Sequence, residues 1–431
     1  MKRIVYGFVL VTLALWGLNL WVHPVAMNTR AVVHEAFYIN GVLAWGFMAM
    51  AIVIAARPAW LERVTGTPLD ALYRWHKVIG IWAGVLTAVH YFTKTLMQPV
   101  LGLMTLESAP RPAANPNLEG FDAFWSWLRG FSNTTAEWAT ILGAVLLVVT
   151  FVSALRYHRW LTTHRLFSII FLAVAAHSIR LMDAEDYLTP FGLLNILITV
   201  VGCWYSLVLL VRGPGREKTT RAVVESVVHD QDLTLVTVRP ERPLAIAAGE
   251  FAFLRLPGHE KHPFSAAEIH DDATVSFAVK GLGDFTRETM PQLAAGDKIW
   301  VEGPWGSFRP DYKAANQLWV AGGVGIAPFC AWLKDAARNT HGAIRLVWCI
   351  RSRESEPLYR RVRDLAQAAG VTLEVYESSK GRLDPGRLFS GLMPGALAMC
   401  AGAGLSRSVE EAYVKAGGRT ADIRREYFDW R

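Results

Sequence analysis

The sequence predicts an all-α membrane bundle of six helices, followed by a small antiparallel β-barrel and a doubly wound α/β domain. Three observations predict this fold class. Nearly all the long apolar runs of the 431-residue chain lie in residues 1–212. Short runs of alternating apolar and polar residues fill 221–310, and glycine-rich turns join strand-like to helix-like segments further on. We therefore expect domains at 1–212, 213–312 and 313–431.

The apolar fraction of 52% and the mean hydropathy of +0.24 suit a membrane protein. Six stretches are long enough to cross a hydrocarbon core of about 30 Å. They lie near residues 4–22, 35–56, 76–97, 134–155, 164–180 and 190–211, and the fifth is the shortest. The first stretch is either a membrane anchor or a signal peptide. We favour the anchor, because no clear small-x-small cleavage site follows it.

Basic residues are concentrated in the loops on one side of the predicted membrane. They are Arg57, Arg63, Arg74 and Lys77, then Arg156, Arg159 and Arg165, then Arg212, Arg216, Lys218 and Arg221. The positive-inside rule therefore predicts a multi-pass protein of the plasma (inner) membrane with both termini in the cytoplasm. Much of the net charge of +7 reflects this membrane orientation, and membrane lipid is an expected partner. The sequence shows no basic stripe with interleaved aromatic residues, so nothing in it indicates nucleic acid as a partner.

Two of the predicted spans open with histidine and carry a second histidine further along. HKVIGIWAGVLTAVH covers residues 76–90, and HRLFSIIFLAVAAH covers residues 164–177. Ionisable residues inside membrane spans are rare and are functional candidates by default. The alternative is that these histidines are hydrogen-bonded packing residues, but two matched pairs make that alternative the weaker one.

The histidine spacing predicts two pairs at two depths. The two steps rise about 21 Å and about 19.5 Å along an α-helix, and both spans run in the same direction. His76 and His164 then share the inner depth, and His90 and His177 share the outer depth. Paired imidazoles suit two six-coordinate haems. A step of 13 residues turns about 220° on an ideal helix, so we expect a bulge or curvature in the fifth span.

Two motifs interrupt the alternating runs of the predicted barrel. The runs are VVESVVHD, LTLVTVRP, EFAFLRLP, TVSFAVK and DKIWVEGP, and the motifs are HPFSAAE (262–268) and KGLGDFT (280–286). The glycines of the second motif allow close backbone approach. They precede a predicted helix, RETMPQL, whose N-terminus offers N–H groups to a phosphate.

The last part of the chain has the pattern of a dinucleotide-binding unit. QLWVAGGVGIAPFCAWLKDAAR (317–338) predicts a strand, a glycine-rich turn and a helix. IRLVWCIRS and TLEVYESS predict further strands, and ALAMCAGAG predicts a strand that enters another glycine turn before a helix. A nucleotide is expected at the carboxyl ends of these strands.

The order of these motifs resembles the ferredoxin-NADP reductase type of flavoprotein. HPFS, GxGxxT, GGVGIAP, CAGAG and a terminal YFDWR follow one another. Joined behind six spans with H-x13-H and H-x12-H, the whole chain resembles the ferric reductase and NADPH oxidase superfamily. The resemblance implies FAD, two b-type haems and NADPH, with NADH as the alternative. It also implies transfer of electrons from cytoplasmic NAD(P)H to an extracytoplasmic acceptor.

The resemblance also implies roles for individual residues. The haem ligands would be His76, His90, His164 and His177. The flavin would be contacted by His262, Pro263, Phe264 and Ser265, and its pyrophosphate by Lys280, Gly281, Gly283 and Thr286. The dinucleotide loop would be Gly322, Gly323, Gly325 and Pro328, with Cys400 and Gly402 near the nicotinamide. Phe428, or alternatively Trp430, would cover the flavin face.

Arg351 and Arg353 stand just past a predicted strand. We interpret them as binding residues for the 2′-phosphate of NADPH, since guanidinium groups pair well with phosphate. The alternative is an ordinary solvated basic turn.

Three functions are compatible with these features. The first is an enzyme that reduces a small-molecule acceptor, dioxygen or a ferric chelate, at the outer haem. The second is a membrane module that donates electrons to a periplasmic partner protein or a quinone. The third is a flavin reductase tethered by a haem-free bundle. We favour the first. The outer loop 98–133 either lies in the membrane interface as an amphipathic helix or caps the outer haem.

Overall fold

The structure is a computed structural model that describes residues 1–25, 29–103, 119–151, 157–182, 185–339, 341–391 and 393–426. Of residues 29–30, 94–103 and 157–160 it describes the backbone alone. The chain forms two compact units. One comprises Met1–Thr67 and Leu72–Arg216, and the other comprises Pro68–Ala71 and Glu217–Arg431.

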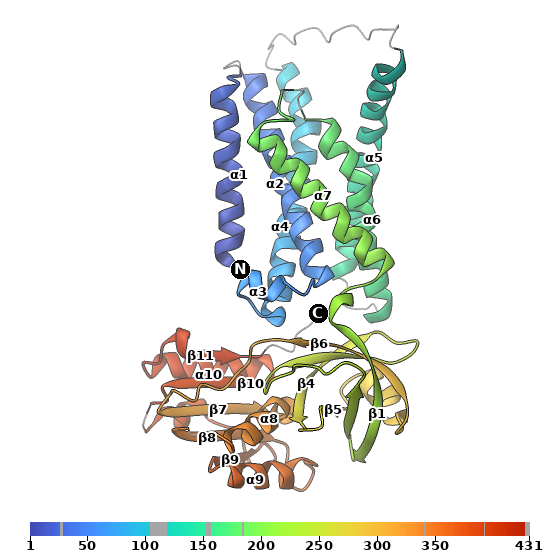
Figure 1. Cartoon of the computed structure of the whole chain (residues 1–431). Coiled ribbons are helices and arrows are strands. Elements are labelled where there is room, and N and C mark those ends of the chain that lie inside the picture. The colour runs from blue at the N-terminus through green and yellow to red at the C-terminus, as the bar shows by residue number, and fades with distance from the viewer. Residues whose placement is uncertain are drawn as a thin grey trace. The chain divides into compact units, whose positions relative to one another are not determined.

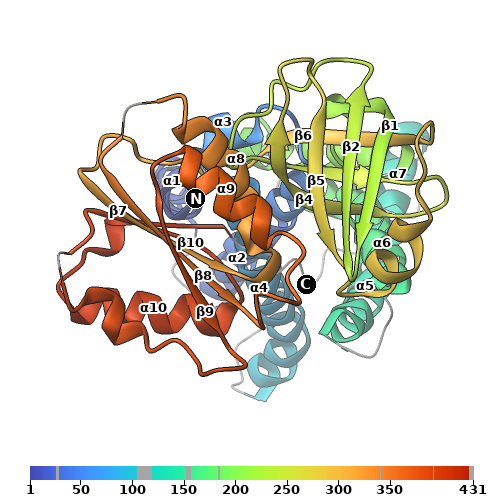
Figure 2. The ribbon, with the colours of Figure 1, turned by 90° about the horizontal axis from the view of Figure 1, so that it is seen from below.

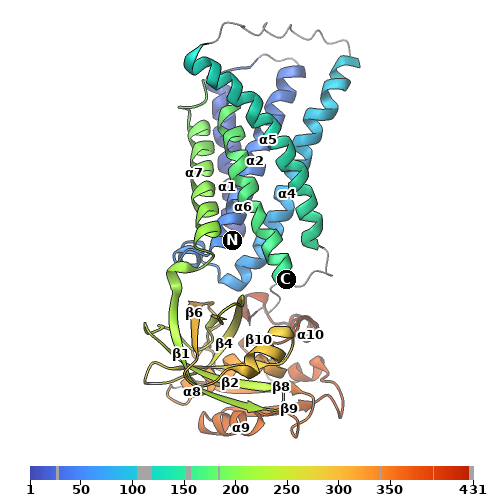
Figure 3. The same cartoon turned by 90° about the vertical axis from the view of Figure 1, so that its right-hand side faces the viewer.

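The first unit is a bundle of long helices, drawn from blue to green in Figure 1. The helices are α1 (Lys2–Val22), α2 (Thr29–Ala56), the short α3 (Leu61–Thr65), α4 (Leu69–Leu103), α5 (Gly120–Phe151), α6 (Tyr157–Arg180) and α7 (Pro190–Val211). In Figure 3, α5, α6 and α7 run along one another. At the centre of the bundle the ring of Trp45 on α2 stacks on Phe171 of α6 with centroids 3.8 Å apart.

Five helices among the described residues are long and apolar enough to cross a membrane. They are Lys2–Val22, Ala31–Ala56, Gly120–Phe151, Leu161–Arg180 and Pro190–Val211. The predicted span 76–97 lies within α4, which is not among these five helices. The least hydrophobic of the five, at a mean hydropathy of 1.2, is the helix that carries the other histidine pair.

The second unit begins with a closed six-stranded barrel. Its strands are β1 (Thr219–Asp230), β2 (Leu233–Pro240), β3 (Phe251–Arg255), β4 (Lys261–Ile269), β5 (Val275–Lys280) and β6 (Lys298–Trp305), in the order β1-β2-β5-β4-β3-β6. The HPFSAAE motif does not interrupt the barrel, because it is itself strand β4 and pairs antiparallel with β3 and β5. Its run of small and polar residues hides the alternation that marks the other strands.

A five-stranded parallel sheet follows the barrel. Its strands are β7 (Asn316–Gly322), β8 (Ala343–Ile350), β9 (Thr372–Glu377), β10 (Ala396–Cys400) and β11 (Ile423–Arg425), in the order β11-β10-β7-β8-β9. Figure 2 shows α8 (Ala327–Ala336) and α9 (Tyr359–Ala368) on one face and α10 (Ala403–Lys415) on the other. The order reverses between β7 and β10, where a doubly wound sheet binds its ligand. The predicted fold class is confirmed.

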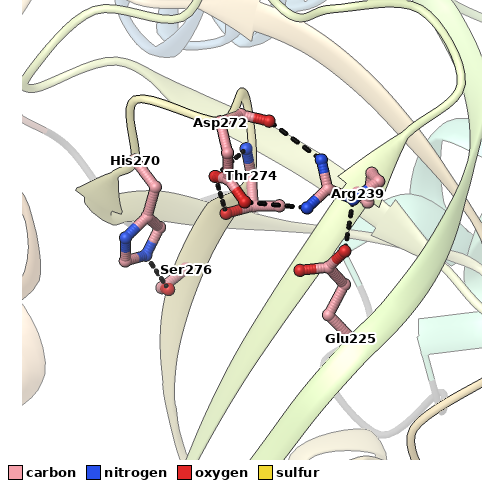
Figure 4. Close-up of polar contacts among 6 residues, drawn as sticks. All are labelled: Glu225, Arg239, His270, Asp272, Thr274 and Ser276. Carbon is pink, nitrogen blue, oxygen red and sulfur yellow. Dashed lines mark hydrogen bonds and ion pairs between the residues drawn. The ribbon is translucent and has the colours of Figure 1, made fainter.

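A polar network fastens the tip of the β4–β5 hairpin to the neighbouring strands (Figure 4). The guanidinium of Arg239 donates to Asp272 at 2.7 Å and also pairs with Glu225. Hydrogen bonds from Thr274 and from Arg239 hold the pKa of Asp272 well below its usual range. His270 on the same hairpin lies 2.8 Å from Ser276. The network stabilises this end of the barrel. At the same end, the Lys334 ammonium of α8 donates a hydrogen bond to the Ile269 carbonyl of β4.

Candidate functional site

The structure brings the four membrane histidines together in two pairs. The ring centroids of His76 and His164 are 5.9 Å apart, and those of His90 and His177 are 6.5 Å apart. Of the expected bulge or curvature, the bulge is absent, since α6 is an α-helix from Tyr157 to Arg180. Helices that cross at an angle present different faces to one another at different depths. Both histidines of α6 therefore reach α4 without a break in the helix.

Helix α2 fixes the orientation of both histidines on α4. The Nδ1 atom of His76 lies 3.0 Å from the carbonyl oxygen of Ala51, and Nδ1 of His90 lies 3.2 Å from that of Phe37. The two carbonyls are separated by the same 14 residues as the two histidines, because α2 and α4 run antiparallel in register. A carbonyl accepts only from a protonated Nδ1, so Nε2 of each ring is left as the metal-binding nitrogen.

Helix α5 sets the tautomer of His164. The Thr150 hydroxyl donates its proton to the Leu146 carbonyl at 2.7 Å. The same oxygen lies 3.3 Å from Nδ1 of His164 and can therefore only accept from it. This again places the proton on Nδ1 and leaves Nε2 as the donor atom.

Close packing at Gly41 makes room for the outer pair. A Cβ atom at Gly41 would lie 2.8 Å from the His90 ring. The ring also stacks on Phe37, with centroids 3.7 Å apart. A larger residue at this position of α2 would displace His90.

The histidine pairs fit haem iron. Two imidazoles on opposite sides of one metal ion, each with a metal–nitrogen bond of about 2 Å, have ring centroids roughly 6 Å apart. Both measured distances are near this value. Within the described ranges, no group of three or more His, Cys, Asp or Glu side chains could hold a metal ion.

In the second unit, three side chains from distant parts of the chain converge. The Ser265 hydroxyl of β4 donates to the Glu426 carboxylate at 3.1 Å, and the Cys400 thiol at the end of β10 lies 3.6 Å from the same oxygen. Glu426 follows β11 and is 4% exposed. Ser265 and Cys400 are expected from the sequence, whereas Glu426 is not. The available signal was an acidic residue directly before the terminal aromatic cluster.

Burial, reinforced by the carboxylate of Asp70, raises the pKa of Glu426 to about 8, although the bonds from Ser265 and Cys400 oppose this. Glu426 lines a pocket of about 130 Å³ within this unit. The other lining residues are Pro68, Asp70, Phe251, Gly306, Ser307, Phe308, Arg424 and Arg425. The buried carboxyl group can therefore hold its proton near neutral pH, which makes it a candidate functional group.

The HPFS residues lie along β4 on the barrel wall. The His262 ring stacks on Phe285 with centroids 3.9 Å apart, and burial lowers the pKa of His262. Pro263 pairs with Phe253 in the neighbouring strand. Phe264 packs against the barrel core. Only Ser265 of this motif reaches Glu426.

The predicted pyrophosphate loop is built around Thr286. The Thr286 hydroxyl accepts hydrogen bonds from the backbone N–H groups of Leu282 and Gly283, each at 2.9 Å. The helix expected after the loop is a short π-helical turn at Phe285–Thr289 and a 3₁₀ turn at Met290–Gln292. The backbone of Gly281 is anchored to Asp232.

Lys280, expected at the pyrophosphate, lies between two carboxylates. Its ammonium is 3.6 Å from Asp232 and 3.7 Å from Glu356, which belongs to the segment between β8 and α9. Burial raises the pKa of Glu356, and Lys280 opposes this effect. Lys280 therefore joins the barrel to the segment that follows β8.

The glycines of the predicted dinucleotide loop lie at the switch point of the sheet. Gly322 ends β7, and a 3₁₀ turn at Gly323–Ile326 leads to Pro328 in the first turn of α8. A Cβ atom at Gly325 would lie 2.1 Å from the carbonyl oxygen of Cys400, so only glycine fits there. Gly402 is the N-cap of α10 beside this loop.

The two arginines after β8 differ in their contacts. The backbone N–H of Arg353 donates to Glu377 at 3.0 Å, and its guanidinium lies 3.4 Å from the same buried carboxylate. The Arg351 side chain is exposed. Arg351 is therefore the arginine better placed to meet a phosphate from solvent.

Phe428 and Trp430 lie outside the described residues. Residues 104–118 of the outer loop 98–133 also lie outside the described residues. The last part of that loop forms the first turns of α5. In those turns Phe121, Phe124 and Trp127 are more than half exposed. This aromatic surface is typical of a helix end in a membrane interface.

The comparisons agree with the resemblance seen in the sequence. A family model described as "Ferric reductase like transmembrane component" matches residues 40–175. Dual oxidase 2 of Rattus norvegicus is 24% identical over 312 residues, 67% of this chain and 20% of that protein. Respiratory burst oxidase homolog protein F of Arabidopsis thaliana is 24% identical over 246 residues, 46% of this chain and 26% of that protein.

Among solved structures, phthalate dioxygenase reductase is similar, with a TM-score of 0.43 and 17% identity over 49% of this chain and 68% of that chain. The chain spans about a fifth of the length of the dual oxidase that it matches. The transmembrane family model, together with the apolar helices, indicates a multi-pass membrane protein. Together with these relatives, it supports a likeness between this chain and the ferric reductase and NADPH oxidase superfamily.

Proposed function

We propose that this protein is a transmembrane oxidoreductase. It passes electrons from cytoplasmic NAD(P)H, through FAD and two bis-histidine haems, to dioxygen or a ferric chelate on the other side of the membrane. The observation that carries the proposal is the geometry of the histidine pairs, at 5.9 Å and 6.5 Å between ring centroids. In each pair the hydrogen bonds at Nδ1 of the α4 histidine direct Nε2 to the metal.

The cofactors supply the redox chemistry: FAD accepts a hydride and releases single electrons, and haem iron carries them one at a time. The protein binds, orients and separates these groups. His76 with His164, and His90 with His177, hold two irons at two depths. Thr286 and the glycines before it form the FAD phosphate loop, and Gly322 to Pro328 form the NAD(P)H loop.

The Glu426 carboxyl group holds and releases a proton in the second unit. Ser265 and Cys400 orient its carboxyl group. A pKa of about 8 lets it hold or release a proton at cytoplasmic pH. If FAD were bound beside this strand, the carboxyl group would hold a proton that it could exchange with the flavin.

The proposal assigns residues 1–212 to the haem domain, 213–312 to the FAD domain and 313–431 to the NAD(P)H domain. Charge in the loops supports an inner-membrane location with the reductase domains in the cytoplasm.

One purification tests the proposal. The full-length protein in detergent should show the spectrum of six-coordinate haem at about two haems per chain, and NADPH should reduce both. Turnover with dioxygen or a ferric chelate alone should follow. Purified protein that binds flavin but no haem would contradict the proposal and indicate a flavin reductase tethered to the membrane by a haem-free bundle. Haem that is reduced but not reoxidised by either acceptor would point to a partner protein or a quinone.

A further inference from the structure

The corner between α6 and α7 holds the end of the helix that carries His177. The last carbonyls of an α-helix have no partner within the helix. Here the carbonyls of three consecutive residues in its last turn, His177 to Ile179, each accept a hydrogen bond. The His177 carbonyl accepts from the N–H of Leu181 at 3.2 Å, and the Ile179 carbonyl accepts from the Tyr187 hydroxyl at 2.9 Å. The Ser178 carbonyl between them accepts a hydrogen bond from a side chain of α7.

Asn195 of α7 makes two hydrogen bonds to Ser178. Its amide nitrogen donates to the Ser178 carbonyl at 3.0 Å, and its amide oxygen accepts from the Ser178 hydroxyl at 3.1 Å. Asn195 is 2% exposed. A fully buried amide inside an apolar bundle is costly unless it is satisfied, and here both ends of it are used on the residue next to His177.

A second layer holds Asn195 itself. The Thr199 hydroxyl, one turn further along α7, donates to the backbone carbonyl of Asn195 at 2.8 Å. It accepts from the indole N–H of Trp45 at 2.9 Å. The network therefore joins α2, α6 and α7 at the depth of the outer histidine pair.

We propose that Asn195 is a positioning residue for the outer histidine pair. It acts through Ser178, by fixing the rotation of the last turn of α6 and hence the direction of the His177 ring. The His90 and His177 ring planes meet at 85°, whereas those of His76 and His164 meet at 66°. Each residue of an α-helix turns by about 100°. A small unwinding at the end of α6 would therefore rotate His177 and leave His164, 13 residues earlier, in place.

This inference rests on the proposed function, because it needs haem at the outer pair. The test uses the full-length protein in two backgrounds that separate the sites. His164→Ala leaves the outer haem alone, and His177→Ala leaves the inner haem alone. Asn195→Leu, which removes both hydrogen bonds at similar volume, is introduced into each. Thr12→Val is the matched control, since Thr12 is also buried but bonds within α1.

The readouts are haem affinity, the midpoint potential and the electron paramagnetic resonance of the ferric low-spin haem, which responds to the angle between the axial imidazole planes. Asn195→Leu should weaken the outer haem about tenfold, the low end of the loss for a group bonded directly to a metal ligand, because Asn195 acts through Ser178. It should also shift the outer resonance and potential. The inner haem should keep its spectrum, and Thr12→Val should change neither.

Two results would overturn the inference: an unchanged outer haem, or equal loss of both haems, which would show a general effect on the bundle. If Asn195→Leu does not fold, Asn195→Ala carries the same expectation. The two proposals fail differently. A wild-type protein without haem contradicts the proposed function, whereas a wild-type protein with two haems and an Asn195 variant with a normal outer haem contradicts only this inference.

Discussion

The membrane bundle places its functional side chains by helix register, whereas the second unit places them by the meeting of strand ends. His76 and His90 lie on one helix and bond to two carbonyls of one neighbouring helix at the same spacing. Ser265, Cys400 and Glu426 come from the barrel, from β10 and from the residue after β11, and Ser265 and Glu426 are 161 residues apart.

The difference shows which kind of site a sequence displays. A site made on helices repeats with the period of the helix and with the depth of the membrane, so its spacing is visible in the chain. A site made at the ends of strands depends on which strands become neighbours, and this depends on the whole fold. The two regions should therefore respond differently to substitution.

The largest expected effect is at the inner histidine pair. His76→Ala or His164→Ala should remove the inner haem and abolish reduction of the outer haem by NADPH, because the electron would have to cross the full span. Haem content and stopped-flow spectra of the purified protein measure this. His34→Ala is the matched control, since His34 lies at the start of α2 beside Glu35 and its side chain is 59% exposed. Normal NADPH-driven reduction of two haems in the His76 variant would show that pairing by depth is wrong.

In the second unit, Gly283→Val should remove flavin and leave haem in place. A Cβ atom at Gly283 meets no atom within 4 Å, so the fold should tolerate the substitution. The added branched side chain would occupy the place that the phosphate must approach. Flavin released from purified protein is the measurement. Gly391→Val is the control, because Gly391 is also free of close neighbours and far from the loop in sequence. Flavin bound with normal affinity in the Gly283 variant would move the pyrophosphate site elsewhere.

Glu426 should make stability depend on pH. Its pKa rises from 4.5 to about 8 in the folded chain, so the folded state holds this proton more tightly than the unfolded state. Stability should therefore fall as pH rises from about 4.5 to about 8, by on the order of a few kcal/mol. Glu426→Gln should flatten that decline, whereas Glu354→Gln, at an exposed position, should not. Thermal unfolding of the full-length protein between these pH values is the measurement, and parallel curves for wild type and Glu426→Gln would contradict the assignment.

The smallest expected effect concerns the choice of nucleotide. Changing Arg351 and Arg353 to serine should raise the KM for NADPH about tenfold, the size of one lost charge-assisted hydrogen bond, and leave the KM for NADH nearly unchanged. Arg351→Ser alone should give most of the effect, since Arg353 is held by Glu377. A wild-type enzyme that uses NADH and NADPH equally, with an indistinguishable double variant, would show that the arginines are a solvated turn.

The sequence by itself determined the fold class and the two membrane depths at which the histidine pairs lie. Apolar run length reports a membrane helix, alternation reports a half-buried strand, and a glycine between a strand and a helix reports a close backbone approach. Each is a local property of the chain. Gly325 is an example, since the glycine-rich turn that contains it is visible in the sequence, although its close approach to the Cys400 carbonyl is a contact of the folded sheet.

Only the tertiary structure decided how these parts are held. It showed that α6 needs no bulge, that HPFSAAE is a barrel strand, and that Lys280 lies between Asp232 and Glu356. It also revealed Glu426 beside Ser265 and Asn195 beside Ser178. Hydrogen bonds and ion pairs of this kind join residues that no periodicity relates. Their partners are set by the packing of whole helices and sheets, which is why the chain alone did not display them.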